Sequence, residues 1–296
     1  MVESRSVVDP PSFLANFHGV TQALRATLLA CLLLTILAKG AAASSPLPRS
    51  APLAALLDEQ TGVILVHDKE SGAWHASDPA AAEVRHAPFS TFKVWNTLAG
   101  LEAGVLSGPE TFIAWDRERF PRESLFVQAW AADHTLRSAY RNSVVWYYQV
   151  VAERIGADRM QRFLDRVGYG NRDLSGGLTR FWLGSSLRIS PREQVERLDA
   201  LLAGRLAVQP EHLAVLEDIA LVERRGACGV YGKSGGGLAR EDRSLWQGWF
   251  IGWLRCGDRL TTFATFLEAA EFARIRDARY RLSRDALKTL GYLPTE

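Results

Sequence analysis

Apolar and polar positions along the chain predict strands near both ends of the sequence. Residues 62–67 form a β-branched apolar run, and a short run at residues 74–75 follows a charged turn, which together predict an opening β-hairpin. Three more apolar runs near the C-terminus predict further strands. They cover residues 229–235, 246–256 and 259–267.

The middle of the chain shows the spacing of helices that bury one face. In two sets of residues, apolar side chains recur at or close to positions i, i+3, i+4 and i+7. The sets are Met160, Phe163, Leu164 and Val167, and Val195, Leu198, Leu201 and Leu202. Together with the terminal strands, these helices predict an α+β fold, in which N- and C-terminal strands form one antiparallel sheet and a helical region is inserted between them.

The N-terminal segment predicts an export signal. Arg25 precedes an apolar run at residues 26–38, which is too short to span a bilayer but suits the core of a secretory signal. Small residues then offer a cleavage site near Ala43; the alternative is an N-terminal membrane anchor. We expect an exported protein, periplasmic or secreted. Its parts are a signal peptide over residues 1–43, a spacer over 44–52 and a single domain over 53–296.

Composition excludes several classes of partner. With 47% hydrophobic and 23% charged residues, the 296-residue chain is typical of a folded domain, with no membrane domain after removal of the leader. The net charge is only +2, and acidic residues alternate with basic ones, so we expect no nucleic-acid partner. The six histidines show no paired spacing, so we expect no metal site. The pattern specifies no oligomeric state.

Ser90 and Lys93 form the first pattern with chemical meaning. The sequence S-T-F-K follows Pro88 and precedes a helical apolar pattern, so we expect the serine to begin a helix. Residues three apart share a helix face, which would place the Lys93 amine beside the Ser90 hydroxyl. The helix N-terminus would supply donors for an oxyanion. Because a lysine with an ordinary pKa is protonated at neutral pH, the amine must be desolvated or chemically altered to act as a base.

Lys233, Ser234 and Gly235 form the second pattern, on a predicted strand before a glycine-rich turn. A cation and a hydroxyl at a strand edge can bind a carboxylate, and a glycine lets another backbone approach closely. Taken singly, these two patterns also fit a helix cap and an ordinary hairpin. However, two of only five lysines fall in them, in the chain order of penicillin-recognising serine enzymes.

Further short motifs lie between and after these two patterns. They are Ser143-Val144-Val145, Tyr169-Gly170-Asn171, Ser175-Gly176-Gly177, Phe181-Trp182-Leu183, Leu187-Arg188-Ile189-Ser190 and Gly248-Trp249-Phe250-Ile251-Gly252-Trp253. With the first two patterns they resemble the class D β-lactamases, the oxacillinases, over residues 62–291. The resemblance implies a penicillin-binding-protein/β-lactamase-like fold and a single catalytic domain.

The resemblance implies how the reaction would be catalysed. Ser90 would attack the lactam carbonyl, with the backbone amides of Ser90 and Gly236 as the oxyanion hole. Lys93 would be N-carboxylated by CO2 and act as general base, with no other cofactor. Val145 and Trp182 would help to form the apolar pocket that this modification needs, and the Trp182 indole N–H would donate to the carbamate.

Other matching residues would handle protons and substrate. Ser143 and Lys233 would pass a proton to the departing nitrogen, and Gly235 and Leu183 would line the substrate site. Phe89 departs from the pattern, because the family usually has a small residue at this position. It lies next to the nucleophile, where it could shape substrate preference.

The substrate carboxylate would be held by Ser234 and an arginine near the C-terminus. Counting back from Gly291 indicates Arg279, with Arg276 and Arg281 as alternatives. The implied function is hydrolysis of small β-lactam antibiotics through a serine acyl-enzyme. The alternatives are a β-lactam sensor domain or a penicillin-binding transpeptidase that stays acylated.

Cys228 and Cys256 are the cysteines outside the predicted signal peptide. Their numbers are symmetric about Asp242, so antiparallel pairing without a bulge would place them opposite each other, within reach of a disulfide. A slip of one residue would turn the side chains to opposite faces, and the glycine-rich turn favours a bulge. We therefore favour two separate free thiols over a bridge.

Overall fold

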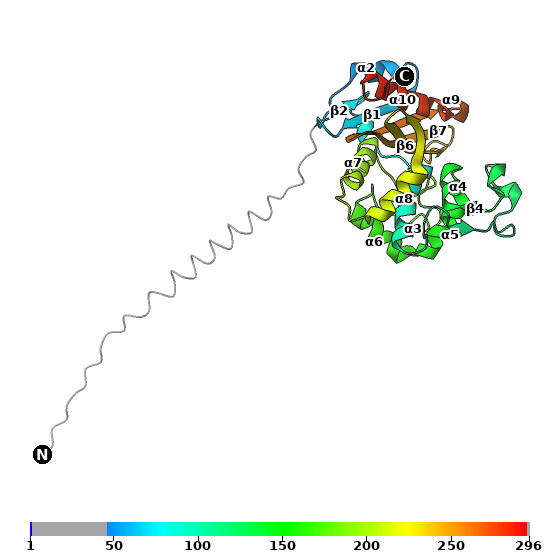
Figure 1. The fold of residues 1–296 in the computed structure, drawn as a ribbon. Coiled ribbons are helices and arrows are strands. Elements are labelled where there is room, and N and C mark those ends of the chain that lie inside the picture. The colour runs from blue at the N-terminus through cyan, green and yellow to red at the C-terminus, as the bar shows by residue number, and fades with distance from the viewer. Residues whose placement is uncertain (2–45, 295–296) are drawn as a thin grey trace. The chain divides into compact units, whose positions relative to one another are not determined.

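Strands from the two ends of the chain meet in one six-stranded antiparallel sheet. The computed structural model describes Met1 and residues 46–294, so the predicted signal peptide lies outside the described residues apart from Met1. The sheet has the order β2-β1-β8-β7-β6-β5. Its strands are β1 (Thr61–Asp68), β2 (Trp74–Ala76), β5 (Leu221–Arg225), β6 (Cys228–Leu238), β7 (Trp246–Cys256) and β8 (Arg259–Ala269). The pairing of β1 with β8 confirms the predicted α+β fold (Figure 1).

Helices cover the two faces of this sheet. The α-helices are α2 (Ala51–Leu57), α3 (Lys93–Glu102), α4 (Leu136–Arg141), α5 (Val145–Ile155), α6 (Ala157–Val167), α7 (Pro191–Leu202), α8 (Pro210–Ala220), α9 (Phe272–Arg276) and α10 (Ala278–Thr289). Short elements are the 3-10 helices η1 (Ala81–Glu83), η2 (Phe89–Phe92), η3 (Arg122–Ser124) and η4 (Gln128–Trp130), and the paired strands β3 (Phe112–Ile113) and β4 (His134–Thr135). The two predicted helices are confirmed as α6 and α7.

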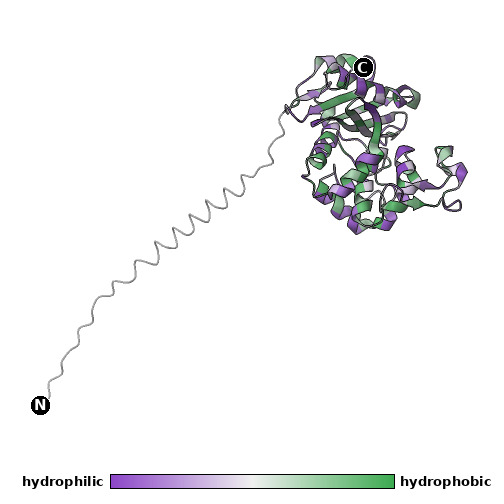
Figure 2. Ribbon diagram, in the orientation of Figure 1, coloured by the Kyte–Doolittle hydropathy of each residue, from purple (hydrophilic) through white to green (hydrophobic). Residues whose placement is uncertain are grey.

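Strand β1 illustrates how the sheet is buried on both faces. Successive side chains of a strand point to opposite faces. Val63 and Leu65 join the core formed with α3 to α8, whereas Ile64 and Val66 join the core formed with α2, α9 and α10. Figure 2 shows hydrophobic residues, in green, gathered in the strands. A continuous apolar run is the expected sequence for such a strand.

The apolar pattern does not predict β5, which forms one edge of the sheet. Three of its five residues are charged, and its burial alternates between half-buried and exposed. It pairs with β6 only from Arg225, opposite Cys228, to Leu221, opposite Tyr231. From Gly232 onward, therefore, no strand within residues 46–294 pairs with this edge of β6, and the open edge faces the candidate site.

The predicted spacer over residues 44–52 overlaps the folded part of the chain. Leu47 is buried, and α2 already begins at Ala51. The compact unit starts at Leu47, six residues before the predicted boundary at residue 53. Pro52 indicated a linker, but proline in the first turn of a helix has no hydrogen bond to lose and is well tolerated.

Cys228 and Cys256 form a disulfide, so the expectation of two free thiols is wrong. Strands β6 and β7 pair without a register shift from the cysteines to the other end, where Leu238 lies opposite Trp246. The two cysteine Cα atoms are 4.2 Å apart, close to the spacing of a non-hydrogen-bonded antiparallel pair. No bulge forms, because the glycines of β6 keep their full pairing with β7.

Two kinds of feature are not found within residues 46–294. No helix there combines the length and apolar character needed to cross a membrane. No group of three or more histidine, cysteine, aspartate or glutamate side chains in this part of the chain is placed to hold a metal ion.

Reduction of the bridge between Cys228 and Cys256 is expected to lower the free energy of unfolding by about 2–4 kcal/mol, because the bridge restricts the unfolded chain. Urea unfolding of the purified protein with and without reductant measures the change. The double variant Cys228→Ser/Cys256→Ser is the control and should not respond to reductant. Equal midpoints for the unmodified protein in both conditions would contradict a stabilising bridge.

Candidate functional site

Ser90 and Lys93 lie in contact where η2 passes into α3. The predicted helix thus begins with a 3-10 turn, and its α-helical part starts at Lys93. Side chains three residues apart lie over one another in a 3-10 helix. Lys93 Nζ donates a hydrogen bond to Ser90 Oγ at 2.8 Å. The turn therefore places an amine directly against a serine hydroxyl.

The Lys93 amine is enclosed by the protein. Its side chain is 0% exposed, and its Nζ lies 5.2 Å from the centre of the Tyr148 ring. Burial, reinforced by the positive charge of Lys233, holds the pKa of Lys93 well below its usual range. No acidic side chain in the described part of the chain opposes this effect. The surroundings therefore favour the neutral amine.

Trp182 supplies a buried donor close to the nucleophile segment. Its ring centre lies 5.8 Å from that of Phe92 and 4.9 Å from that of Phe181. The side chain is fully buried, and its Nε1 has no hydrogen-bond partner among the described residues. An unpaired buried donor costs about 1–3 kcal/mol, so an acceptor added at this position would be stabilised.

Strand β6 presents its residues alternately to the nucleophile and to the C-terminal helices. Lys233 and Gly235 face the helical region. A Cβ on Gly235 would lie 3.0 Å from the backbone nitrogen of Ser90, so glycine lets the nucleophile segment pack on the strand. Gly236 is exposed and faces the opposite side, where a Cβ would lie 3.1 Å from the Arg279 guanidinium.

Lys233 and Arg279 add two more buried cations. Lys233 is 4% exposed, and its Nζ lies 5.6 Å from the Tyr140 ring centre. Burial, together with the charge of Arg279, lowers the pKa of Lys233 to about 7. Arg279 is 6% exposed and donates to the Gly235 carbonyl. Neither cation forms an ion pair with a carboxylate of the described chain, so the site has an excess of positive charge suited to an anion.

Of the three arginines considered for carboxylate binding, Arg279 lies at this site. Arg276 is exposed and pairs with Asp277, and Arg281 is exposed and pairs with Asp285. The geometry therefore favours Arg279. Ser234, half-buried on the same strand as Lys233, also lines a pocket of about 380 Å³.

Ser143, Val145 and Leu183 flank this centre. Ser143 joins α4 to α5 with a φ of +58°, uncommon for a residue other than glycine, and its N–H donates to the Tyr140 carbonyl at 3.2 Å. Its hydroxyl makes no hydrogen bond to the lysines or to Ser90 in the part of the chain described. Val145 and Leu183 are half-buried. The roles of all three stay predictions.

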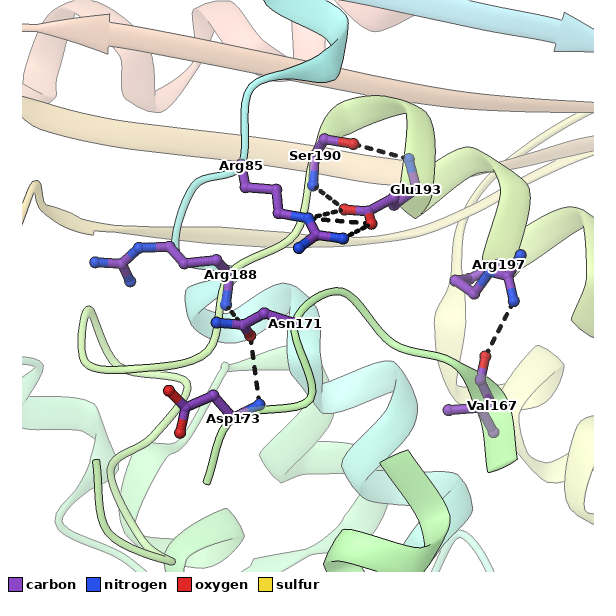
Figure 3. Close-up of polar contacts among 8 residues, drawn as sticks. All are labelled: Arg85, Val167, Asn171, Asp173, Arg188, Ser190, Glu193 and Arg197. Atoms are coloured by element: carbon purple, nitrogen blue, oxygen red, sulfur yellow. Dashed lines mark hydrogen bonds and ion pairs between the residues drawn. The ribbon is translucent and has the colours of Figure 1, made fainter. Parts of the chain in front are cut away.

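The loop that carries Trp182 is closed by the Y-G-N motif. Asn171 Oδ1 accepts the N–H of Arg188 at 2.8 Å and that of Asp173 at 3.4 Å (Figure 3). Gly170 has a φ of +52°, and a Cβ there would lie 2.0 Å from the Arg188 carbonyl oxygen. Y-G-N therefore fixes the two ends of the loop against each other.

The L-R-I-S motif ends this loop and begins α7. Ser190 and Glu193 form a reciprocal capping box, and Arg85 donates to the Glu193 carboxylate from Nε at 2.9 Å (Figure 3). Farther along the helix, Arg197 donates to the Val167 carbonyl at 3.2 Å. The motif thus has a structural role, because it fixes the start of α7 at the end of the loop. The bond from Arg197 then holds α7 against α6.

A buried polar link that the sequence analysis missed holds the nucleophile segment in place. Gln194 Nε2 donates to Thr91 Oγ1 at 3.0 Å, and the Tyr169 hydroxyl donates to Gln194 Oε1 at 3.4 Å. The one sign of this link in the sequence is a glutamine next to Val195, on the side of a predicted helix that is buried. Its partner lies 103 positions away, so local spacing could not identify the link.

Comparisons with known proteins show which family this chain resembles. A family model described as "Penicillin binding protein transpeptidase domain" matches residues 53–286. The chain is similar to beta-lactamase OXA-10 of Pseudomonas aeruginosa, with 32% identity over 69% of this chain and 74% of that protein. A crystal structure of the class D beta-lactamase YbXI from Nostoc has 33% identity and a TM-score of 0.74, covering 81% of this chain and 99% of that one.

One solved relative is a receptor. The C-terminal domain of the Bacillus licheniformis BlaR penicillin-receptor has 25% identity and a TM-score of 0.77. The similarity covers 85% of this chain and 99% of that chain.

Gly170→Ala is expected to destabilise the protein by about 2 kcal/mol more than Gly204→Ala. Both glycines have left-handed backbones, with φ of +52° and +68°, but a Cβ on Gly204 would meet nothing within 4 Å. The excess is the strain of forcing a methyl group against Arg188. Urea unfolding of both variants measures it, and equal losses would show that the loop does not need the close approach.

Proposed function

The chain belongs to the class D serine β-lactamases, and from that premise we propose that it hydrolyses β-lactam antibiotics through an acyl-enzyme on Ser90. The observation that carries the proposal is the hydrogen bond of 2.8 Å between Ser90 Oγ and the fully buried amine of Lys93. A serine hydroxyl becomes nucleophilic when an adjacent base removes its proton. Burial makes this lysine suited to that task, because it favours the neutral amine.

The open edge of β6 supplies the place for the reacting carbonyl. Ser90 packs on Gly235, which supports its backbone N–H and that of the neighbouring, exposed Gly236 as the two oxyanion donors. Backbone donors fixed before the reaction stabilise the charge that develops on the carbonyl oxygen. This arrangement supports attack by Ser90 on a lactam held along the strand.

The Lys93 amine is proposed to carry a carboxylate derived from CO2. A neutral amine reacts with CO2 and releases a proton, and the full burial of this amine, 5.2 Å from the centre of the Tyr148 ring, favours that neutral form. The unpaired Trp182 N–H is the donor that would hold the added group. The carbamate supplies a general base, both for activating Ser90 and for activating the water that releases the product.

Lys233 is proposed to handle the proton of the leaving nitrogen together with Ser143. Burial and the nearby Arg279 lower the pKa of Lys233 to about 7, so it can both give and accept a proton near neutral pH. Ser143 is held by its left-handed backbone at the start of α5. Their joint effect would be protonation of the nitrogen as the lactam ring opens.

Ser234 and Arg279 are proposed to bind the substrate carboxylate. The Arg279 guanidinium is anchored on the Gly235 carbonyl, and its Nε has no partner in the described chain. A buried arginine with a free N–H is suited to a charge-assisted hydrogen bond. Substrates would therefore be small β-lactams with a carboxylate, and the protein would meet them in the periplasm or outside the cell.

A β-lactam receptor is the second candidate function, favoured by the likeness to the BlaR domain. The two functions differ in whether the acyl group leaves Ser90. The purified mature protein, mixed with excess chromogenic cephalosporin, is expected to develop colour over many equivalents. Colour that stops at one equivalent would support the receptor, and Ser90→Ala should give none in either case.

Activity is expected to fall as the solution becomes acidic and to recover on addition of bicarbonate. Since burial lowers the pKa of Lys93, the neutral amine persists to a lower pH than that of an ordinary lysine, whereas acid protonates it and releases CO2. Steady-state rates across pH, with and without bicarbonate, measure this. Lys93→Ala should lose about 100-fold or more and show no bicarbonate response. Lys288→Ala, a lysine on α10, is the matched control and should behave like the parent.

Trp182→Phe is expected to acylate at a normal rate but to deacylate about 10-fold to 100-fold more slowly. The variant loses a hydrogen bond to a charged group, worth about 1.5–3 kcal/mol. Stopped-flow mixing should show a burst of about one equivalent followed by slow turnover. Rapid turnover without a burst would contradict the role given to the indole.

A further inference from the structure

Phe89 combines an unusual backbone conformation with a buried position next to the nucleophile. Its φ is +48°, in the left-handed region that bulky residues rarely adopt, and its side chain is 5% exposed. It immediately precedes Ser90 in η2. Strained residues persist where the surrounding structure over-determines them, and they cluster at functional sites.

The Phe89 ring lies between two glycines from different elements. A Cβ on Gly237 of β6 would lie 2.3 Å from the ring, and a Cβ on Gly184 would lie 3.2 Å from it. The same Cβ on Gly184 would lie 3.6 Å from the carbonyl oxygen of Leu238, at the end of β6. Nucleophile segment, strand and loop therefore meet at this one ring.

This contact joins the parts of the site that must keep their spacing. Gly184 follows Trp182 by two residues, and Gly237 follows Gly235, on which Ser90 packs, by two residues on the same face of β6. If the ring were absent, the loop and the strand would lose their shared support, because glycines on either side offer no side chain to fill the space.

We propose that Phe89 is a positioning residue, whose ring sets the spacing between β6 and the loop of Trp182 and thereby keeps the Trp182 indole in place for the modified Lys93. The inference rests on the proposed function, since it concerns the carbamate. The inference explains why a large side chain stands next to the nucleophile. It also explains why positions 184 and 237 are glycines.

The test compares carbamate occupancy with turnover in three variants. Carbon-13 NMR of protein titrated with labelled bicarbonate should show that Phe89→Ala needs about fivefold more bicarbonate, or more, for half occupancy, the size expected when one hydrogen bond is weakened. Its deacylation should slow more than its acylation. Phe89→Gly removes the backbone strain as well as the ring and should show the same defect. Phe89→Leu, which keeps part of the volume, should lie between.

A double-mutant cycle tests the contact itself. Gly237→Ala pushes a methyl group into the ring and should produce the same defect, whereas adding it to Phe89→Ala should cause little further change. Phe112→Ala, which removes an exposed ring on β3, is the control and should match the parent. Additive effects of the two substitutions, or recovery of parent occupancy in Phe89→Gly, would overturn the inference.

Failure of the proposed function would look different. A parent protein without turnover, or without a carbamate signal, would refute the mechanism and the inference with it. A parent with both, alongside Phe89 variants that lose only stability in urea, would refute the inference alone. In that case the ring would merely pack the interior.

Discussion

Burial of the Lys93 amine is the constraint on which the rest of the site depends. An ammonium that is fully buried beside the Tyr148 ring, without a carboxylate partner in the described chain, loses its hydration and favours the neutral form. In the proposed mechanism, this neutrality would let the amine react with CO2 and form the carbamate that takes the proton from Ser90. The Trp182 N–H is also buried without a partner in the described chain, and the proposed carboxylate on Lys93 would supply an acceptor for it.

The sheet supplies the fixed side of the site. Strand β6 pairs along its whole length with β7 and is joined to it by the Cys228–Cys256 disulfide, but its other edge is open from Gly232 onward. Successive residues of β6 point to opposite faces of the sheet, so they contribute to different parts of the site. Lys233 faces the nucleophile, and Gly236 faces the C-terminal helices and Arg279. The helical insertion supplies the other side, with the nucleophile segment resting on the strand.

Local spacing was enough to predict the elements and the closest contact of the site. The apolar runs predict β1, β2, β6, β7 and β8, and the separation of three residues predicts the contact between Ser90 and Lys93. Local spacing could not predict the features that depend on how distant segments pair. The disulfide required pairing without a bulge over eleven residues of each strand, and Gln194 finds its partner only in the folded chain. The choice of Arg279 required knowing which side chain of α10 reaches the Gly235 carbonyl of β6.

The most direct test of this account is a crystal structure of the mature protein, grown at alkaline pH with bicarbonate. The account predicts three additional atoms of continuous density on Lys93 Nζ, with one oxygen within hydrogen-bond distance of Trp182 Nε1. An unmodified Lys93 under these conditions, with the Trp182 indole bonded elsewhere, would contradict it.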